Sequence, residues 1–168
     1  MKGNQILIQE NPRGVKKAII VSGTPKPGTA MSLKLATAAD ANGLLTYEPA
    51  GTTAADGFDG MTNDGDRCDF GILLEDENQG KTYDSAYADG DHGWIYFPLP
   101  GEELNVLLEN QSGTGDAFAV GDKLMIDNGT GKFLAVDTDA EAEPFVCAEA
   151  VAALTADAWV WAIRSTDT

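Results

Sequence analysis

The fold class of this chain is decided most clearly by the stretch GDKLMIDNGTGKFL, residues 121–134. Two short apolar runs flank an Asn-Gly pair, which is the strongest short-range signal for a tight turn between antiparallel strands. Turn-forming residues also separate short apolar runs on both sides of this stretch. The chain has 19 glycines and 7 prolines, and its apolar runs are too short for helices. This pattern is typical of all-β proteins. We therefore expect a compact β-barrel or β-sandwich, of the jelly-roll or β-tulip kind.

The register of this hairpin depends on the length of its loop. A two-residue loop would place Phe133 opposite Leu124, whereas a four-residue loop would place it opposite Ile126. The four-residue loop also sets Asp127 against Lys132. We expect this second register, because it matches apolar partners and opposes unlike charges across the strands.

Similar reasoning places the other strands. They are expected, in chain order, at residues 18–22, 31–35, 44–47, 70–75, 81–87, 93–100, 103–108, 145–154 and 158–164. A helix stays open as the alternative for residues 148–154, whose alanines suit one. Residues 51–66 are mostly Gly, Asp, Thr, Ala and Asn, so we expect them to form a long surface loop.

Charge is divided sharply along the chain. Residues 1–34 hold six of the 11 basic residues and one of the 27 acidic ones, so they carry a formal +5 and the remainder −21. Pro25 and Pro27 favour extended backbone at the residues before them. We therefore expect an extended basic N-terminal arm over residues 1–34 and an acidic β domain over residues 35–168. The cations expected to bind an acidic partner are Lys2, Arg13, Lys16, Lys17, Lys26 and Lys34.

The run GWIYFPLP, residues 93–100, is apolar without alternation. Neighbouring side chains of a strand point to opposite faces, so both faces of this strand would be apolar. One face can meet the domain core, and the other needs cover from an arm, a loop or a second subunit. We expect this strand to supply an oligomer interface. Its residues are expected to be Trp94, Ile95, Tyr96, Phe97 and Leu99.

Patterns of catalytic and metal-binding residues are absent from the sequence. His92 is the only histidine, so no multi-histidine zinc site can form, and no serine lies in a GxSxG motif. Gly80-Lys-Thr82 matches only the end of a phosphate-binding loop, because Glu75 stands where that motif needs glycine. The acidic residues of 51–66 do not follow the EF-hand pattern. We expect no enzyme activity, no cofactor and no bound metal.

Two tryptophans near the C-terminus allow two interpretations. Trp159 and Trp161 would share one face of a strand, where they could stack on a sugar ring or could serve as core or interface anchors. The first interpretation gives the alternative function, a ligand- or carbohydrate-binding β module that uses these tryptophans or the acidic loop 51–66. Cys68 and Cys147 have no CxxC spacing, and we expect both to be reduced and buried.

Targeting signals and membrane spans are not evident either. The N-terminal apolar run covers only residues 6–8, which is too short for the core of a secretory signal. No stretch approaches the ~20 apolar residues that a membrane-spanning helix needs. The charge of −21 on residues 35–168 opposes the approach of nucleic acid. We expect a protein made in the cytoplasm that binds neither membranes nor nucleic acid.

In its order of features the chain resembles the decoration, or cement, proteins of tailed-bacteriophage heads. The resemblance covers residues 40–164 and is carried by the VGDKLMIDNGTGKFL hairpin and by the preceding element Tyr87-Ala-Asp-Gly90-Asp91. It implies a small β-barrel or β-sandwich on the outside of the capsid, in a homo-oligomer for which a trimer is favoured over a dimer. The chain departs from the lambda head-decoration type in its greater length and in its acidic loop.

The same resemblance implies a function. A protein of this kind is a non-enzymatic virion structural protein that stabilises the head by bridging major capsid subunits. Its partners would be the major capsid protein and further copies of itself. It would be made in the host cytoplasm and located on the outer capsid surface.

Overall fold

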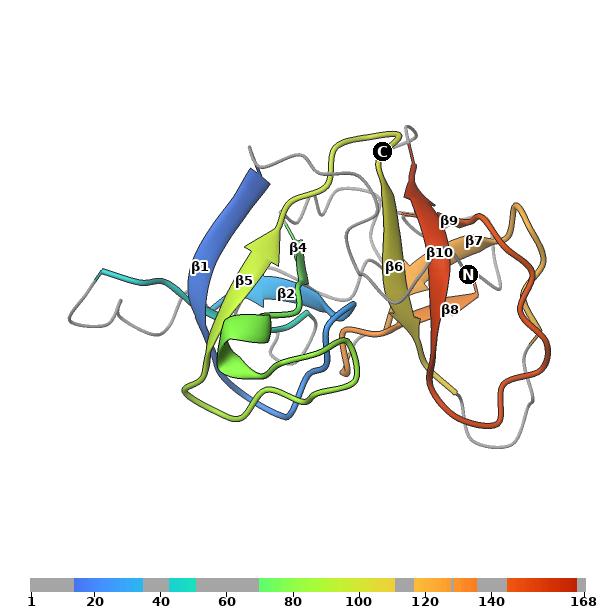
Figure 1. The fold of residues 1–168 in the computed structure, drawn as a ribbon. Helices are drawn as coiled ribbons and strands as arrows, with labels where there is room; N and C mark the ends of the chain where they lie inside the picture. The colour runs from blue at the N-terminus through green and yellow to red at the C-terminus, as the bar shows by residue number, and fades with distance from the viewer. Residues whose placement is uncertain are drawn as a thin grey trace.

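The chain folds into two small closed β-barrels that lie side by side (Figure 1). The computed structural model describes residues 14–34, 43–50, 70–110, 117–127, 129–135 and 145–165. These residues contain ten strands, the short 3₁₀-helix η3 (Glu77–Gln79) and no α-helix. The first barrel holds β1 (Val15–Ile20), β2 (Ala30–Leu33), β3 (Thr46–Pro49), β4 (Gly71–Leu73) and β5 (His92–Tyr96). The second holds β6 (Glu103–Leu108), β7 (Lys123–Ile126), β8 (Phe133–Ala135), β9 (Phe145–Cys147) and β10 (Ala158–Arg164). The prediction of an all-β barrel fold is confirmed.

The strands of the first barrel follow one another in the order β1-β3-β2-β4-β5. Strand β1 closes the barrel, because it pairs in parallel with β3 and in antiparallel with β5. Side chains alternate between the two faces of β1, so Ala18 and Ile20 are buried inside the barrel while Lys17, on the opposite face, is exposed. The interior is filled by Ala18, Ile20, Met31, Tyr47, Leu73, Tyr87 and Ile95.

The second barrel has the strand order β10-β6-β8-β7-β9. Its longest ladder joins β6 and β10, in which Val106 opposes Val160 and Leu104 opposes Ala162. The β7–β8 hairpin has the expected register, since Ile126 pairs with Phe133. The backbone N–H of Asp127 donates to the carbonyl oxygen of Lys132 at 2.8 Å, which completes the predicted four-residue loop.

The two barrels share one apolar core. Residues of the first barrel, among them Ala30, Ile72 and Tyr96, belong to the same buried cluster as Val106, Phe133 and other core residues of the second barrel. Hydrogen bonds cross the same junction: the N–H of Ala30 donates to the Gly131 carbonyl at 2.8 Å, and the N–H of Leu107 donates to the Gly28 carbonyl at 3.0 Å. The barrels are therefore packed together as one body.

Strand β5 uses both of its apolar faces within the chain. Ile95 lies in the core of the first barrel, whereas Tyr96 lies in the core that both barrels share. On the second face, which was expected to need cover, the second barrel thus covers Tyr96, whereas Trp94 stays 37% exposed. The apolar run of residues 93–97 forms the inner wall of the first barrel where it meets the second.

Several predicted elements differ from those observed. Within the expected arm, residues 15–20 and 30–33 form β1 and β2 of the first barrel, because their apolar residues find partners far along the chain. Residues 81–87 form turns and an isolated bridge at Lys81 in place of a strand. Residues 148–154 contain no helix, and Val151 forms an isolated bridge with Phe118. Residues 1–13, the loop 51–66 and Cys68 lie outside the described residues.

Candidate binding surface

The pairing of β1 with β5 brings together two sets of residues that the sequence keeps far apart. In this ladder Lys17 is paired with Trp94, and the Lys17 ammonium lies 6.0 Å from the centre of the Trp94 ring. The Lys16 ammonium lies 4.9 Å from the centre of the Phe97 ring. Both lysines are exposed. Because neighbouring residues of a strand point to opposite faces, the Lys17–Trp94 pair lies on the outer face of the first barrel, and the Lys16–Phe97 pair lies on the face that bears the core residue Ile95, at the end of the ladder. We call the part of β1 and β5 that carries both pairs the β1–β5 surface.

The Trp94 ring is held in place by a neighbouring segment. Its Nε1–H donates to Oδ2 of Asp76 at 3.1 Å, and Asp76 caps the 3₁₀-helix η3 by accepting from the N–H of Asn78. The ring is nevertheless 37% exposed, so it presents apolar area to solvent beside Lys17. A fixed, half-exposed indole next to an ammonium group is a ready binding element, since little side-chain freedom remains to be lost on binding. The hydrogen bond from Trp94 to Asp76 was not predicted from the sequence.

Four other lysines form ion pairs with acidic side chains of the same chain, which neutralise them. These pairs are Lys26–Asp84 at 2.6 Å, Lys34–Glu48 at 2.8 Å, Lys81–Asp91 at 2.7 Å and Lys132–Asp157 at 2.9 Å. Among the described residues, Lys16 and Lys17 have no acidic partner. Two unneutralised cations on neighbouring positions are unusual in a chain of net charge −16.

The six cations predicted to bind a partner therefore fall into three groups. Lys16 and Lys17 are exposed on β1. Lys26 and Lys34 brace the fold, because Lys26 binds Asp84 and Lys34 reaches the fully buried carboxylate of Glu48. Lys2 and Arg13 lie outside the described residues.

Two of the five residues predicted for the oligomer interface are buried. Ile95 and Tyr96 are 0% and 1% exposed, so they are core residues and cannot contact a second subunit in this fold. The prediction overlooked that a second barrel could cover the outer face of the strand. Of the remaining residues, Phe97 is half-buried, and Trp94 and Leu99 are exposed.

Trp159 and Trp161 do not form an open platform. The Trp159 ring contacts Tyr83 edge-on at 5.2 Å, lies 5.6 Å from the Lys26 ammonium, and donates its Nε1–H to the Pro27 carbonyl at 2.8 Å. Trp161 is half-buried, and its backbone N–H donates to Glu149. Trp159 thus anchors the junction between the barrels, and no contact here favours sugar binding.

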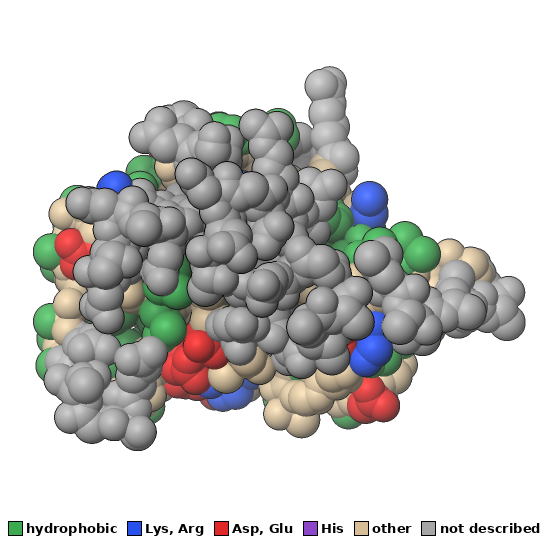
Figure 2. All heavy atoms as spheres, turned by 180° about the vertical axis from the view of Figure 1, so that it is seen from behind, with side chains coloured by type: hydrophobic (Ala, Val, Ile, Leu, Met, Phe, Trp, Pro, Cys, Tyr) green, Lys and Arg blue, Asp and Glu red, His purple; other side chains and the backbone are tan. Residues whose placement is uncertain are grey.

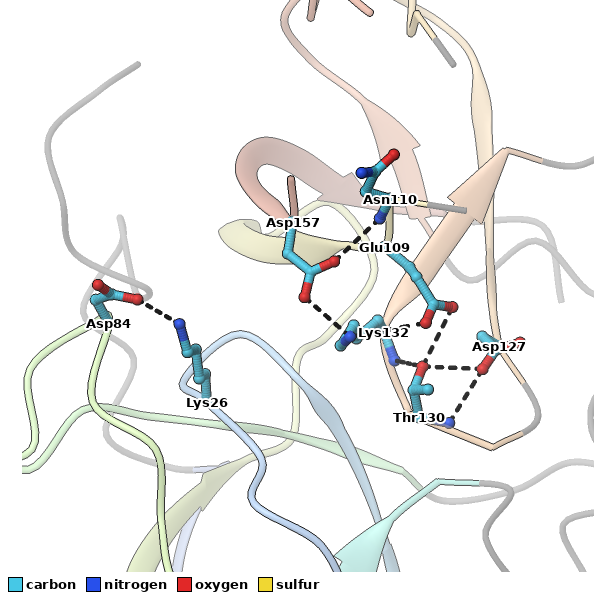
Figure 3. Close-up of polar contacts among 8 residues, drawn as sticks. All are labelled: Lys26, Asp84, Glu109, Asn110, Asp127, Thr130, Lys132 and Asp157. Atoms are coloured by element: carbon cyan, nitrogen blue, oxygen red, sulfur yellow. Dashed lines mark hydrogen bonds and ion pairs between the residues drawn. The ribbon is translucent and has the colours of Figure 1, made fainter. Parts of the chain in front are cut away.

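A cluster of charged side chains gathers where three segments of the second barrel meet (Figure 3). Lys132 lies between Asp157 at 2.9 Å and Glu109 at 3.6 Å, and Thr130 bridges Glu109 and Asp127 through its hydroxyl group. Burial, followed by the charge of Asp127, raises the pKa of Glu109. Burial also opposes ionisation of Asp157, but hydrogen bonds from Lys132 and from the N–H of Asn110 outweigh it and lower its pKa. Lys132 thus pairs with two of the three carboxylates, Glu109 and Asp157, and Thr130 links the third, Asp127, to Glu109. These contacts hold the three segments of the second barrel together.

The described residues contain no cluster of metal-ligating side chains. No group of three or more His, Cys, Asp or Glu side chains in this part of the chain could hold a metal ion. His92 begins β5 and is half-buried, and its carbonyl oxygen accepts from Gln79. Cys147 is a buried free thiol. No helix in the described segments is both long and apolar enough to cross a membrane.

Basic side chains do not gather into a broad surface on the face seen from behind. In Figure 2 the Lys and Arg side chains of the described residues lie as separate spots, interspersed with acidic ones. Nucleic-acid binding usually requires a continuous basic surface that follows the phosphates. Among the described side chains visible in this view, no such surface is present.

Comparison with known proteins gives no family: no protein-family model matches the chain, and no curated protein matches it.

Proposed function

We propose that this chain is a non-enzymatic virion structural protein that binds the outer surface of a phage head and stabilises it by bridging major capsid subunits. The observation that supports the proposal is the β1–β5 surface, where two exposed lysines without acidic partners among the described residues stand beside aromatic rings. A charged and aromatic surface of this kind suits an acidic protein partner. The resemblance to decoration proteins supplies the identity of that partner.

The packing of the two barrels suits such a role. Two barrels that share a core form a rigid body, so binding at the β1–β5 surface would hold the whole chain in one orientation on the lattice. The net charge of −16 keeps free copies apart in solution through mutual repulsion. Self-association on the head is part of the proposal, with Leu99 as the exposed residue of the expected interface that lies outside the β1–β5 surface.

The double variant Lys16→Glu/Lys17→Glu tests the binding surface. We expect its affinity for undecorated heads to fall about tenfold or more at low salt, because two attractions become repulsions. The loss should shrink at about 0.5 M salt, where exposed charges are screened. Co-sedimentation of the protein with heads measures both quantities, and cryo-electron microscopy of the decorated heads shows where the protein lies.

A matched pair of single variants separates local from overall charge. Lys17→Glu and Lys123→Glu change the net charge equally, and Lys123 is exposed on β7 of the second barrel. Only Lys17→Glu should weaken binding strongly. Equal losses for the two variants would show that net charge, and not the β1–β5 surface, governs attachment. Wild-type protein that leaves heads undecorated would remove the capsid proposal itself.

A further inference from the structure

The Lys17–Trp94 pair has a geometry that selects one kind of partner group. The ammonium lies 6.0 Å from the ring centre, so the ring occupies one side of it and its remaining N–H donors face solvent. The ring is anchored at its Nε1 by Asp76, which leaves a carbon face exposed beside the charge. A ligand that fits must bring an anionic oxygen to the ammonium and an apolar stem to the indole.

An Asp or Glu side chain meets both requirements. Its carboxylate forms a charge-assisted hydrogen bond with an ammonium group, and its methylene groups can lie on an aromatic face. A nucleic-acid strand can also stack a base on the indole, but its closely spaced phosphates would be repelled by the chain's net charge of −16. A single carboxylate carried by a protein experiences that repulsion far less.

We infer that the partner surface presents an Asp or Glu side chain to Lys17 and Trp94, with the carboxylate bound by the Lys17 ammonium and the methylene groups packed on the Trp94 ring. The inference rests on the proposed function, because it names the chemistry of the capsid surface that the β1–β5 surface contacts. Lys16, beside Phe97, adds a second positive charge at the next position of β1. Within the wider β1–β5 surface, the Lys17–Trp94 pair is thus the anchor that binds a carboxylate side chain of the partner.

Zero-length cross-linking with a carbodiimide tests the contact directly on decorated heads. The reagent joins an amine to a carboxylate only where the two already touch, and mass spectrometry identifies the joined peptides. The chain carries its own positive controls, since Lys26–Asp84 and Lys81–Asp91 lie 2.6 and 2.7 Å apart. We expect these internal links together with a link from Lys17 to an Asp or Glu of the capsid protein.

The outcomes separate this inference from the proposed function. Heads that carry the protein but yield only the internal links would overturn the carboxylate anchor and leave the capsid role standing. Heads that carry no protein would overturn both. A single-stranded oligonucleotide that binds the free protein and loses that binding in Lys17→Met would also overturn the assignment to a carboxylate.

Variants measure how much the anchor contributes. Lys17→Met keeps the apolar stem and removes the charge, and Trp94→Leu removes the ring, so each should weaken binding to heads about tenfold. Lys17→Arg should keep most of the affinity. Lys123→Met, the control on β7, should stay within about twofold of wild type. Unchanged affinity in both Lys17→Met and Trp94→Leu would contradict the inference, whatever cross-links form.

Discussion

Replacing Gly131 by alanine is expected to destabilise the protein by about 3 kcal/mol, because it combines an overpacked junction with a strained backbone. A Cβ atom at this position would lie 2.4 Å from the carbonyl oxygen of Ala30 and 3.0 Å from the backbone nitrogen of Ala50. Neither of these backbone atoms can swing aside as the end of a side chain would. Gly131 also has φ +69°, a conformation that favours glycine. Urea unfolding followed by tryptophan fluorescence measures the loss.

The same turn supplies the control. At Gly129 a Cβ atom would meet only the Asp127 carboxylate at 3.6 Å, an ordinary contact, so Gly129→Ala should change stability by less than about 0.5 kcal/mol. Gly131→Ala with unchanged stability would mean that the barrels do not meet closely at this turn. If Gly131→Ala folds at reduced temperature, its thermal midpoint provides the same comparison.

The junction also determines whether the β1–β5 surface is held in place. Strand β5 forms one wall of the first barrel and, through Tyr96, part of the shared core. The Tyr96 hydroxyl donates to Glu102, whose carboxylate also accepts from the N–H of Leu99 at 2.7 Å. A loosened junction would therefore disturb the strand that carries Trp94. Stability and the proposed partner binding would therefore be linked through this one strand.

Sequence reasoning succeeded where the deciding interactions are local. The register of the β7–β8 hairpin follows from side chains within a few residues of the turn, and Ile126 does pair with Phe133. The expectation that β5 would be apolar on both faces also held, because alternation along a strand is a property of neighbouring residues. Strand β6 was expected at residues 103–108, where it is found.

The interactions that were not predicted from the sequence join residues that lie far apart along the chain. Residues 15–20 carry lysines and precede two prolines, so they resembled an arm, yet their apolar residues close a barrel against β5. The pairing of Lys17 with Trp94 joins positions that no local pattern connects. The predicted opposition of Asp127 and Lys132 held for the backbone, but the Lys132 side chain binds Asp157 and Glu109. Only the tertiary fold brings those acids within reach.

The positions of β1 and β2 change the interpretation of the charge division at residue 34. It does not mark the end of an arm, because β1 and β2 of the first barrel are built from residues before it. Two of the cations before it, Lys26 and Lys34, bind acids that come after it. What remains unneutralised there, among the described residues, is the pair Lys16 and Lys17. Of the basic residues before position 35 that the structure describes, only these two are therefore candidates for binding an acidic partner.

Replacing Lys132 by methionine is expected to destabilise the protein by about 2 kcal/mol at pH 7 and by much less near pH 4. Methionine keeps the apolar stem but leaves Glu109 and Asp157, which lie beside Asp127, without their shared cation (Figure 3). The estimate lies below that for a fully buried pair, because these side chains are partly exposed. Unfolding curves for wild type and variant at several pH values measure the difference.

The direction of the pH dependence follows from the two shifted acids. The lowered pKa of Asp157 contributes stability at pH values above its ordinary 3.8, and that contribution is lost as the pH falls through the folded-state pKa. The raised pKa of Glu109 costs stability at neutral pH, and this cost disappears as the pH falls through its own folded-state value, above 4.5. Without Lys132 both pKa values should rise, so acidification should relieve the repulsion in the variant more than in wild type. Lys17→Met, which removes an exposed charge without an acidic partner among the described residues, should run parallel to wild type between pH 7 and pH 4. A Lys132→Met deficit that stays constant between pH 7 and pH 4 would show that packing of the stem, and not the three carboxylates, explains the loss.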